Sequence, residues 1–343
     1  MGTTQQDVAR RAKVSRALVS LVMRGAPNVS DSSRRKVLRA ADELGYRPNA
    51  FARALASKRI HTIGVLVNDV TNPYFGGLFA SLAAAARIAG YDILTAPGTR
   101  VAGSEAGLVN TLLEHQVAGL ALLSPLMPTA ELRAITSAHP TVVIGREVSI
   151  AGVDVVTTDE DDAAHRVVAH LYSHGHRHIA HITGANNRPS RDREKALRRT
   201  LAEFGLDPLV VPGTFTEEGG RRGARQLLAE GHVPTAVVGA NDLCAVGAIG
   251  ALRSAGLRIP DDVSVIGYDD SQIARLEVVQ LTSVCQPIEQ FGQASIATLL
   301  ERIEDPRRER SVQRIRTELV ERSTSGPAPH TPRAAVRRRR RSG

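Results

Sequence analysis

The chain has 343 residues, an apolar content of 42 % and a formal net charge of +9. This length allows more than one domain, and the lack of any run of 18 apolar residues excludes a transmembrane helix. The first residues, MGTTQQDVARR, lack the apolar core of a signal peptide, so we expect a cytoplasmic protein. Cys244 and Cys285 have neither CxxC nor zinc spacing, and we expect both to be reduced, in or near the core.

The positive charge is concentrated at the two ends of the chain. Residues 1–59 contain 13 Lys and Arg against 4 Asp and Glu, and residues 327–343 contain 6 Arg and no acidic residue. Residues 60–326 carry 25 basic against 31 acidic residues, a net charge of −6. A basic head on an acidic body favours a polyanionic partner, usually nucleic acid, over a merely solvated basic face.

Residues 3–46 have the spacing of three short helices. Ser15 and Ser30 are suitable N-caps for the second and third helices, and Gly45 is a suitable stop. The residues expected to face one shared core are Val8, Ala9 and Ala12, then Val14, Leu18, Val19 and Val22, then Val37, Leu38, Ala41 and Leu44. The start of the second helix remains exposed, as in a helix-turn-helix that reads DNA. A protein-binding three-helix module is the alternative, and the local basic charge favours DNA.

Residues 47–59, RPNAFARALASKR, combine a basic composition with two apolar residues on one helical face. Phe51 and Leu55 are four residues apart, and Arg53 falls on the opposite face. A helix of eight or nine residues is marginal alone in water, so this segment is either a linker or a helix that a partner must stabilise.

From residue 60 onward, short apolar runs alternate with stretches of helical spacing. The runs are TIGVLV, YDILTA, GLALLS, TVVIG, DVVTT, HIAHITG, AVVGA and VSVIGYD, and LFASLAAAARIAG is one of the helical stretches. This alternation is typical of parallel sheets with crossover helices, which bind ligands at the carboxyl ends of their strands.

Several other patterns in the chain bear on metal binding, catalysis and oligomeric state. The stretch HRVVAHLYSHGHRHIAH has six histidines, but no Cys, Glu or Asp completes a familiar zinc site, so we expect surface histidines rather than a metal site. No phosphate-loop, serine-hydrolase, zinc-protease or dinucleotide motif is present, so we expect neither an enzyme nor a cofactor.

Residues 327–343, Pro-rich and then Arg-rich, are expected to be disordered and to add nonspecific DNA affinity. They lack the heptads of a tetramerising coiled coil, so a dimer is expected.

The motifs DVARRAKVS, VSDSSRRKVLRAADELGYRPNAFARALAS, HTIGVLVNDVTNPYF, AVVGANDLCAVGAIGALRSAGLRIPDDVSVIGYDD and RTELVERSTS, in this order, closely resemble the lactose-repressor family of bacterial transcription regulators. The resemblance covers about residues 3 to 326. It implies an all-α helix-turn-helix head at 1–46, a hinge helix at 47–59, and a two-lobed α/β periplasmic-binding-protein-like effector and dimerisation domain at 60–326. The chain would cross between the lobes near 158–163 and 286–290, with a smaller third passage.

The resemblance also assigns DNA contacts. In the second helix they are Ser15, Arg16, Ala17 and Ser20; in the hinge they are Asn49, Arg53 and the minor-groove wedge Leu55, with Phe51 at the contact between two hinge helices. Two residues depart from the family pattern. Leu21 replaces an Arg, which leaves the adjacent base contact open, and Lys13 replaces the turn Gly, so the turn is expected to differ slightly.

The same resemblance implies an effector site. Its residues are Asn72, Tyr74, Phe75, Arg146, Arg193, Asn241 and Asp269. Asp, Asn and Arg side chains in one cleft suit a polyhydroxylated ligand, because they form paired hydrogen bonds with neighbouring hydroxyls. The alternative is that Asn241 and Asp269 merely cap helices. Ala196 and Leu197 stand where the family has Gly and Phe.

The implied function is a ligand-responsive DNA-binding regulator, expected to repress carbohydrate-related genes. Its expected partners are a palindromic double-stranded operator, a sugar effector and a second copy of the chain, with no membrane. A regulator with a non-sugar effector or a degenerate pocket remains an alternative. A solute-binding receptor is a weaker one, because it would need a signal peptide and no DNA-binding head.

Overall fold

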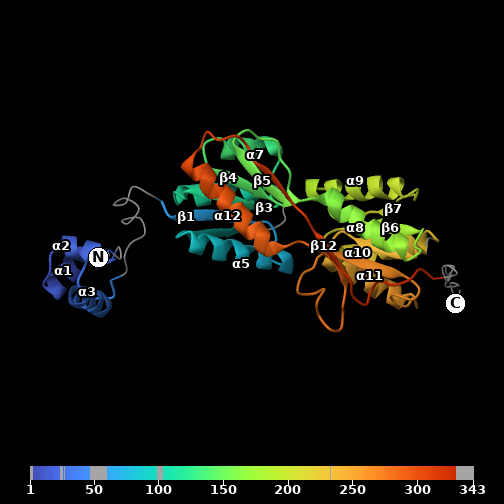
Figure 1. Ribbon diagram of the computed structural model, residues 1–343, viewed down its shortest axis with the longest axis horizontal. Coiled ribbons are helices and arrows are strands. Elements are labelled where there is room, and N and C mark those ends of the chain that lie inside the picture. The colour runs from blue at the N-terminus through green and yellow to red at the C-terminus, as the bar shows by residue number, and fades with distance from the viewer. Residues whose placement is uncertain are drawn as a thin grey trace, which may run out of the picture. The chain divides into compact units, whose positions relative to one another are not determined.

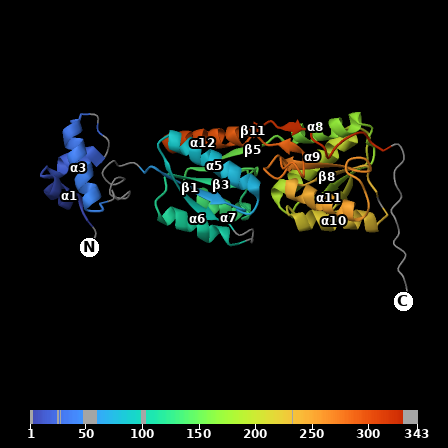
Figure 2. The same cartoon turned by 90° about the horizontal axis from the view of Figure 1, so that it is seen from below.

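The computed structural model describes residues 3–23, 26, 28–46, 60–98, 103–231 and 233–329. The chain divides into two compact units, Met1–Ile60 and His61–Gly343. Figures 1 and 2 show that the larger unit consists of two lobes, each built on its own sheet. The hinge predicted at residues 47–59 lies outside the described residues.

The smaller unit is a three-helix bundle made of α1 (Gln5–Ala12), α2 (Arg16–Met23) and α3 (Asp31–Glu43). Each helix contributes one fully buried valine to a shared core: Val8, Val19 and Val37. The three predicted helices are therefore confirmed. Leu38 was expected to face inward, but it is 50 % exposed, and Ala40 is buried instead.

The helix ends follow the predicted capping. Ser15 Oγ accepts a hydrogen bond from the Leu18 amide at 3.2 Å, and Gly45 follows α3 with φ +61°. Lys13 adopts the left-handed conformation, with φ 55° and ψ 47°. The residue that replaces the turn Gly of the family pattern therefore lies in the left-handed region, which costs Lys13 about 1–2 kcal/mol.

The first lobe contains a six-stranded sheet in the order β11-β5-β4-β3-β1-β2. Its strands are β1 (Thr62–Val67), β2 (Asp92–Pro97), β3 (Gly119–Leu123), β4 (Thr141–Ile144), β5 (Val153–Thr158) and β11 (Val312–Ile315). Its helices are α5 (Pro73–Ile88), α6 (Glu105–Glu114), α7 (Thr129–Thr136) and α12 (Ile288–Glu304). Apolar residues of α5 and α12 pack on one face of the sheet, and those of α6 and α7 pack on the other.

The second lobe repeats this architecture with the strand order β12-β10-β9-β8-β6-β7. Its strands are β6 (Ile179–Ile182), β7 (Leu209–Val211), β8 (Ala236–Gly239), β9 (Ser264–Asp269), β10 (Thr282–Cys285) and β12 (Glu318–Val320). Its helices are α8 (Glu160–Ser173), α9 (Arg188–Glu203), α10 (Glu217–Ala229) and α11 (Asp242–Ser254). Helices α8 and α9 cover one face, and α10 and α11 cover the other.

The chain passes between the lobes three times, after β5, after β10 and after β11. The first two passages coincide with the predicted crossings near 158–163 and 286–290. The eight predicted strands are all present, but β7, β10, β11 and β12 were not expected, and β12 pairs antiparallel with β10. The sheets are therefore mostly rather than wholly parallel.

The C-terminal part of the described chain packs on the second lobe. The Ala328 amide donates to the carbonyl oxygen of His174 at 2.8 Å, so the ordered chain extends past residue 326, where disorder was expected to begin. The Arg-rich remainder, 330–343, lies outside the described residues. In the described part of the chain, no helix is long and apolar enough to cross a membrane.

Candidate functional site

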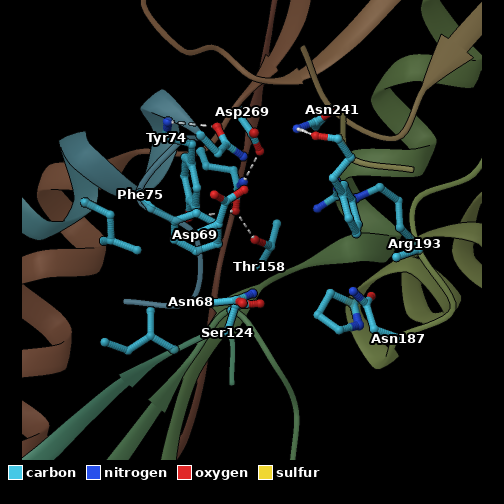
Figure 3. Close-up of a pocket in the computed structure, with 18 of the residues that line it drawn as sticks. Asn68, Asp69, Tyr74, Phe75, Ser124, Thr158, Asn187, Arg193, Asn241 and Asp269 are labelled. Carbon is cyan, nitrogen blue, oxygen red and sulfur yellow. Dashed lines mark hydrogen bonds between the residues drawn. The ribbon is translucent and has the colours of Figure 1, made fainter. Parts of the chain in front are cut away.

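A cavity lies between the two lobes of the larger unit, where the carboxyl ends of strands from both sheets meet (Figure 3). Its volume is about 150 Å³. Its lining combines carboxylate, amide and hydroxyl groups with an apolar side. The residues are Asn68, Asp69, Asn72, Tyr74, Phe75, Leu78, Ser124, Leu126, Ile144, Gly145, Thr158, Glu160, Ala185, Asn187, Pro189, Arg193, Phe215, Asn241, Asp269 and Gln286.

The first lobe supplies an aromatic corner and two amides. Asn72 is the N-cap of α5, and its side chain accepts a hydrogen bond from the Tyr74 amide at 3.0 Å. This cap fixes the first turn of α5, so that Tyr74 and Phe75 both face the cavity with ring centroids 5.3 Å apart in an edge-on arrangement. Asn68, directly after β1, is buried, and its Oδ1 has no hydrogen-bond partner among the described residues. That oxygen is free to accept a ligand hydroxyl.

The second lobe supplies one cation, Arg193, whose charge is already compensated. Its guanidinium pairs with Glu160 at 3.3 Å, donates to the carbonyl oxygen of Ala240 and stacks over the Tyr268 ring, with Cζ 3.3 Å from the centroid. Burial opposes this charge, but the Glu160 carboxylate and Tyr268 raise the pKa of Arg193 above its ordinary value. Arg193 therefore remains charged, yet it contributes little net positive charge to the cavity.

Asp269, at the end of β9, is buried and has φ 108°, a conformation that costs on the order of 1–3 kcal/mol for a residue with a side chain. Burial, with repulsion from Asp242, raises the pKa of its carboxyl to about 8, although Arg193 and hydrogen bonds from Gln286 and Asn72 oppose this. Asp269 is thus mostly protonated at neutral pH. A strained, buried acid in a cleft is a common feature of binding sites.

Gln286 connects the two lobes through hydrogen bonds. Its Oε1 accepts from Thr158 Oγ1 at 2.6 Å and from Tyr74 Oη at 3.2 Å, both in the first lobe. Its Nε2 donates to Asp269 Oδ1 at 2.8 Å in the second lobe. Because Gln286 lies on the passage between β10 and α12, a ligand that displaces any of these groups changes a bond between the lobes.

The structure brings six of the seven sequence-predicted effector residues to this cavity, namely Asn72, Tyr74, Phe75, Arg193, Asn241 and Asp269. The seventh, Arg146, does not line it. The Arg146 guanidinium is directed at backbone carbonyls of its own lobe and borders a neighbouring charged cleft instead.

Sequence reasoning missed several lining residues. These are chiefly Asn68, Asp69, Ser124, Thr158, Glu160, Asn187, Phe215 and Gln286. Most of them follow a strand at its carboxyl end, so the rule that places ligands there could have found them. Gln286 was not predictable in this way, because β10 was not recognised as a strand.

The histidine-rich stretch is only partly at the surface. His176 and His181 are 0 % and 1 % exposed, so the expectation of surface histidines is wrong for these two. The ring of His176 forms two hydrogen bonds at 3.0 Å, from Nδ1 with Thr235 Oγ1 and from Nε2 with the Gly326 carbonyl oxygen, and burial lowers the pKa of His176. Burial lowers the pKa of His181 to about 4. The described residues contain no group of three or more His, Cys, Asp or Glu that could hold a metal.

The head has its own candidate surface at the start of α2. Ser15, Arg16 and Ala17 are exposed, and Ser20 is half-buried. The Arg16 side chain makes no hydrogen bond or ion pair with any described residue, so it is available to a partner. Leu21, where the family pattern has Arg, packs partly against the small core. The predicted hinge contacts Asn49, Phe51, Arg53 and Leu55 lie outside the described residues.

Comparisons with known proteins agree over both units. Residues 4–49 match the family model for bacterial regulatory proteins of the lacI family, and residues 168–325 match a periplasmic binding protein-like domain. The chain is 34 % identical to catabolite control protein A of Priestia megaterium, over 87 % of this chain and 92 % of that protein. It is 35 % identical to the ribose operon repressor of Haemophilus influenzae, over 88 % and 92 %.

Solved structures of related regulators also match this chain. The lac repressor bound to ONPG in its repressed state matches with a TM-score of 0.85 and 29 % identity, over 95 % of this chain and all of that chain. The lac repressor dimer bound to operator and the anti-inducer ONPF matches with a TM-score of 0.83, 29 % identity and the same coverage. A regulator from Enterococcus faecium with bound ribose matches with a TM-score of 0.69 and 28 % identity, over 78 % of this chain and 99 % of that one.

Proposed function

Because this chain belongs to the lacI family of bacterial regulatory proteins, we propose that it represses transcription as a homodimer whose operator affinity is set by a small uncharged effector. In this proposal residues 1–46 read DNA, 47–59 form the hinge, 60–326 bind the effector and dimerise, and the Arg-rich tail adds nonspecific affinity. The relatives are named as regulators rather than enzymes, and we place this protein in the cytoplasm on the nucleoid, where operators are found.

The start of α2 supports the DNA-reading role. Its N-terminal end presents Arg16 and Ala17 to solvent, and an Arg there can donate two hydrogen bonds to O6 and N7 of a guanine. Ala17 is small enough to contact a thymine methyl group. The lac repressor dimer that matches this chain is bound to an operator, and two heads related by a dimer axis would read a palindrome.

The charge of the cavity carries the proposal of an uncharged effector. Arg193 is the one cationic residue among the described residues that line it, and Glu160 already neutralises it, whereas Asp69 and Asp269 add further carboxyl groups. Within the described lining, a phosphate or carboxylate on the ligand would meet these acids without a free cationic side chain. The remaining groups, which include the unpartnered Oδ1 of Asn68, suit several hydroxyl groups beside an aromatic corner, and an unphosphorylated sugar has this chemistry.

The test begins with selection of an operator from random double-stranded DNA by the full-length protein. Operator binding and thermal stability are then measured with D-ribose, D-glucose, D-galactose, cellobiose and nucleosides, and with ribose 5-phosphate and glucose 6-phosphate. We expect at least one neutral ligand to raise the melting temperature and change operator affinity. Its phosphate ester should bind at least about tenfold more weakly, because a charge is buried without a partner. A phosphate ester that binds more tightly than its parent sugar would overturn the uncharged effector, and failure to select any DNA consensus would overturn the regulator.

A further inference from the structure

The segment between β3 and α7 forms part of the cavity wall in the first lobe. Ser124 and Leu126 line the cavity, and Ser124 has φ 48°, a left-handed conformation that a serine seldom adopts. The loop is short and carries no secondary structure of its own. Something outside the segment must therefore hold its backbone in place.

Arg146 holds the carbonyl side of this segment. It follows β4, is 8 % exposed, and its Nη1 donates to the carbonyl oxygens of Pro125 and Met127, both at 2.7 Å. Its Nη2 donates to Thr129 Oγ1 at 3.2 Å, at the start of α7. The planar fork of the guanidinium thus spans the segment from one end to the other.

Glu105 holds the amide side of the same segment. It is the first residue of α6 and is 1 % exposed, and its Oε2 accepts hydrogen bonds from the amides of Leu126 and Met127 at 2.7 and 2.8 Å. Two buried side chains of opposite charge therefore hold the same short stretch of backbone: the guanidinium binds its carbonyl oxygens, and the carboxylate binds its amides. No hydrogen bond or ion pair joins Arg146 directly to Glu105.

We infer that Arg146 and Glu105 are positioning residues of the effector cavity, which together clamp residues 125–127 so that Ser124 and Leu126 form a fixed wall. This inference rests on the proposed function in taking the cavity as an effector site. The clamp gives Arg146 a role different from the direct ligand contact that the sequence suggested. Removing either side chain leaves the backbone groups that it holds without their hydrogen-bond partners, which makes the loop depend on both.

A purely structural pair would be built differently, as the same lobe shows. Arg302, which is 2 % exposed, pairs directly and bidentately with Asp154 at 2.9 and 3.0 Å and also holds the loop after α12 through carbonyl oxygens. Neither Arg302 nor Asp154 lines the cavity. Arg146 and Glu105 instead leave one polar atom each, Nε and Oε1, buried without a hydrogen-bond partner among the described residues. Arg146 and Glu105 thus leave more polar atoms without hydrogen-bond partners than Arg302 and Asp154 do, but the segment that they hold is part of the cavity wall.

The test compares Arg146→Lys with Arg302→Lys in the full-length protein. Lysine keeps the charge and loses the fork, and Arg302 is the matched control because it is a buried arginine that holds another loop of the same lobe. Hydrogen–deuterium exchange is followed at the amides of Leu126 and Met127. We expect Arg146→Lys to speed exchange there by about tenfold or more, because local opening is then easier, and Arg302→Lys to leave it nearly unchanged. Glu105→Leu should have the same effect as Arg146→Lys, and Glu105→Gln, which keeps an acceptor oxygen, should restore most of the protection.

Several outcomes would overturn the clamp. Unchanged exchange at both amides in Arg146→Lys would do so, and so would equal acceleration in Arg302→Lys, which would show a general loss of stability. If the neutral sugar panel yields a ligand, its affinity must fall in Arg146→Lys by more than in Arg302→Lys; equal affinities would show that the loop does not shape the cavity. If no sugar binds the parent protein, the proposed effector fails, whereas the exchange result still decides whether the clamp holds the loop.

Discussion

Asp269 allows a direct test of the electrostatics of the cavity, through the substitution Asp269→Asn. Asparagine keeps an oxygen that can accept the hydrogen bond from Gln286 Nε2 but cannot ionise. The Asp269 carboxyl has a pKa of about 8 in the folded protein against 3.8 ordinarily, and burial is the largest cause. Folding therefore holds a proton on Asp269 that the unfolded chain releases.

The sign of the pH dependence follows from this difference. Below about pH 4 the carboxyl is protonated in both states and costs nothing. Between about pH 4 and pH 8 the unfolded chain loses the proton while the folded protein keeps it, so stability falls as pH rises; above about pH 8 both states are ionised and the slope vanishes. The two pKa values differ by about four, which corresponds to an upper bound on the order of 5 kcal/mol. Asp269→Asn should remove this loss.

Urea unfolding of the parent protein and Asp269→Asn between pH 4.5 and 9 would measure the effect, with these pH limits set by the window between the two pKa values. We expect similar stability at the acid end and a more stable variant at the alkaline end. Asp270→Asn is the matched control, because Asp270 pairs with Arg275 at 2.9 Å and Arg322 at 2.6 Å, and its loss should destabilise the protein across the range. A stability difference between the parent and Asp269→Asn that does not change with pH would refute a buried neutral Asp269.

Three further predictions concern the head, the hinge segment and the passage between the two lobes. Arg16→Ala should weaken operator binding by about 1–3 kcal/mol and relax preference at one base pair per half-site, which repeated DNA selection would detect; an unchanged consensus would exclude base reading by Arg16. Leu55→Ala should reduce operator bending and specific binding more than nonspecific binding, measured with circularly permuted fragments, and undiminished bending would exclude a wedge. Gln286→Leu should lower unfolding free energy by about 1–3 kcal/mol, because it leaves the Tyr74 and Thr158 hydroxyls without their acceptor; unchanged urea unfolding would contradict this.

Seven of the eight strands that the sequence revealed lie inside a sheet and are mostly buried; the exception is β2, which lies at a sheet edge. Runs such as TIGVLV and GLALLS form β1 and β3, which lie inside the first sheet and are almost wholly buried. By contrast, the unexpected strands β7, β11 and β12 lie at sheet edges and are only partly buried. An edge strand with one covered face needs few apolar residues, so VQRI and ELV give no strong signal.

Arg146 and Leu38 show what residue type alone does not reveal. From sequence alone, a basic residue that follows a strand near a cleft can either contact a ligand or bind backbone carbonyls. For Arg146 the position of the β3–α7 segment decides for the backbone. In α3, Leu38 and Ala40 lie on different faces of the helix. Ala40 is buried because it lies three residues after Val37, on the face that Val37 and Ala41 bury, while Leu38 is half-exposed.

Helix capping and ligand binding, which the sequence left as alternatives for Asn241, are compatible in this fold. Asn72, Asn187 and Asn241 each cap a helix with the side-chain oxygen, and each lines the cavity. Capping uses one acceptor and leaves the amide N–H groups for other partners; Asn241 donates one to the Phe215 carbonyl oxygen. The N-termini of α5, α9 and α11 therefore face the cavity with their positive ends, which partly offsets its carboxylates. The cap fixes each amide near the carboxyl end of a strand, so in the proposed effector site its N–H groups would have a fixed position from which to bind a hydroxyl group.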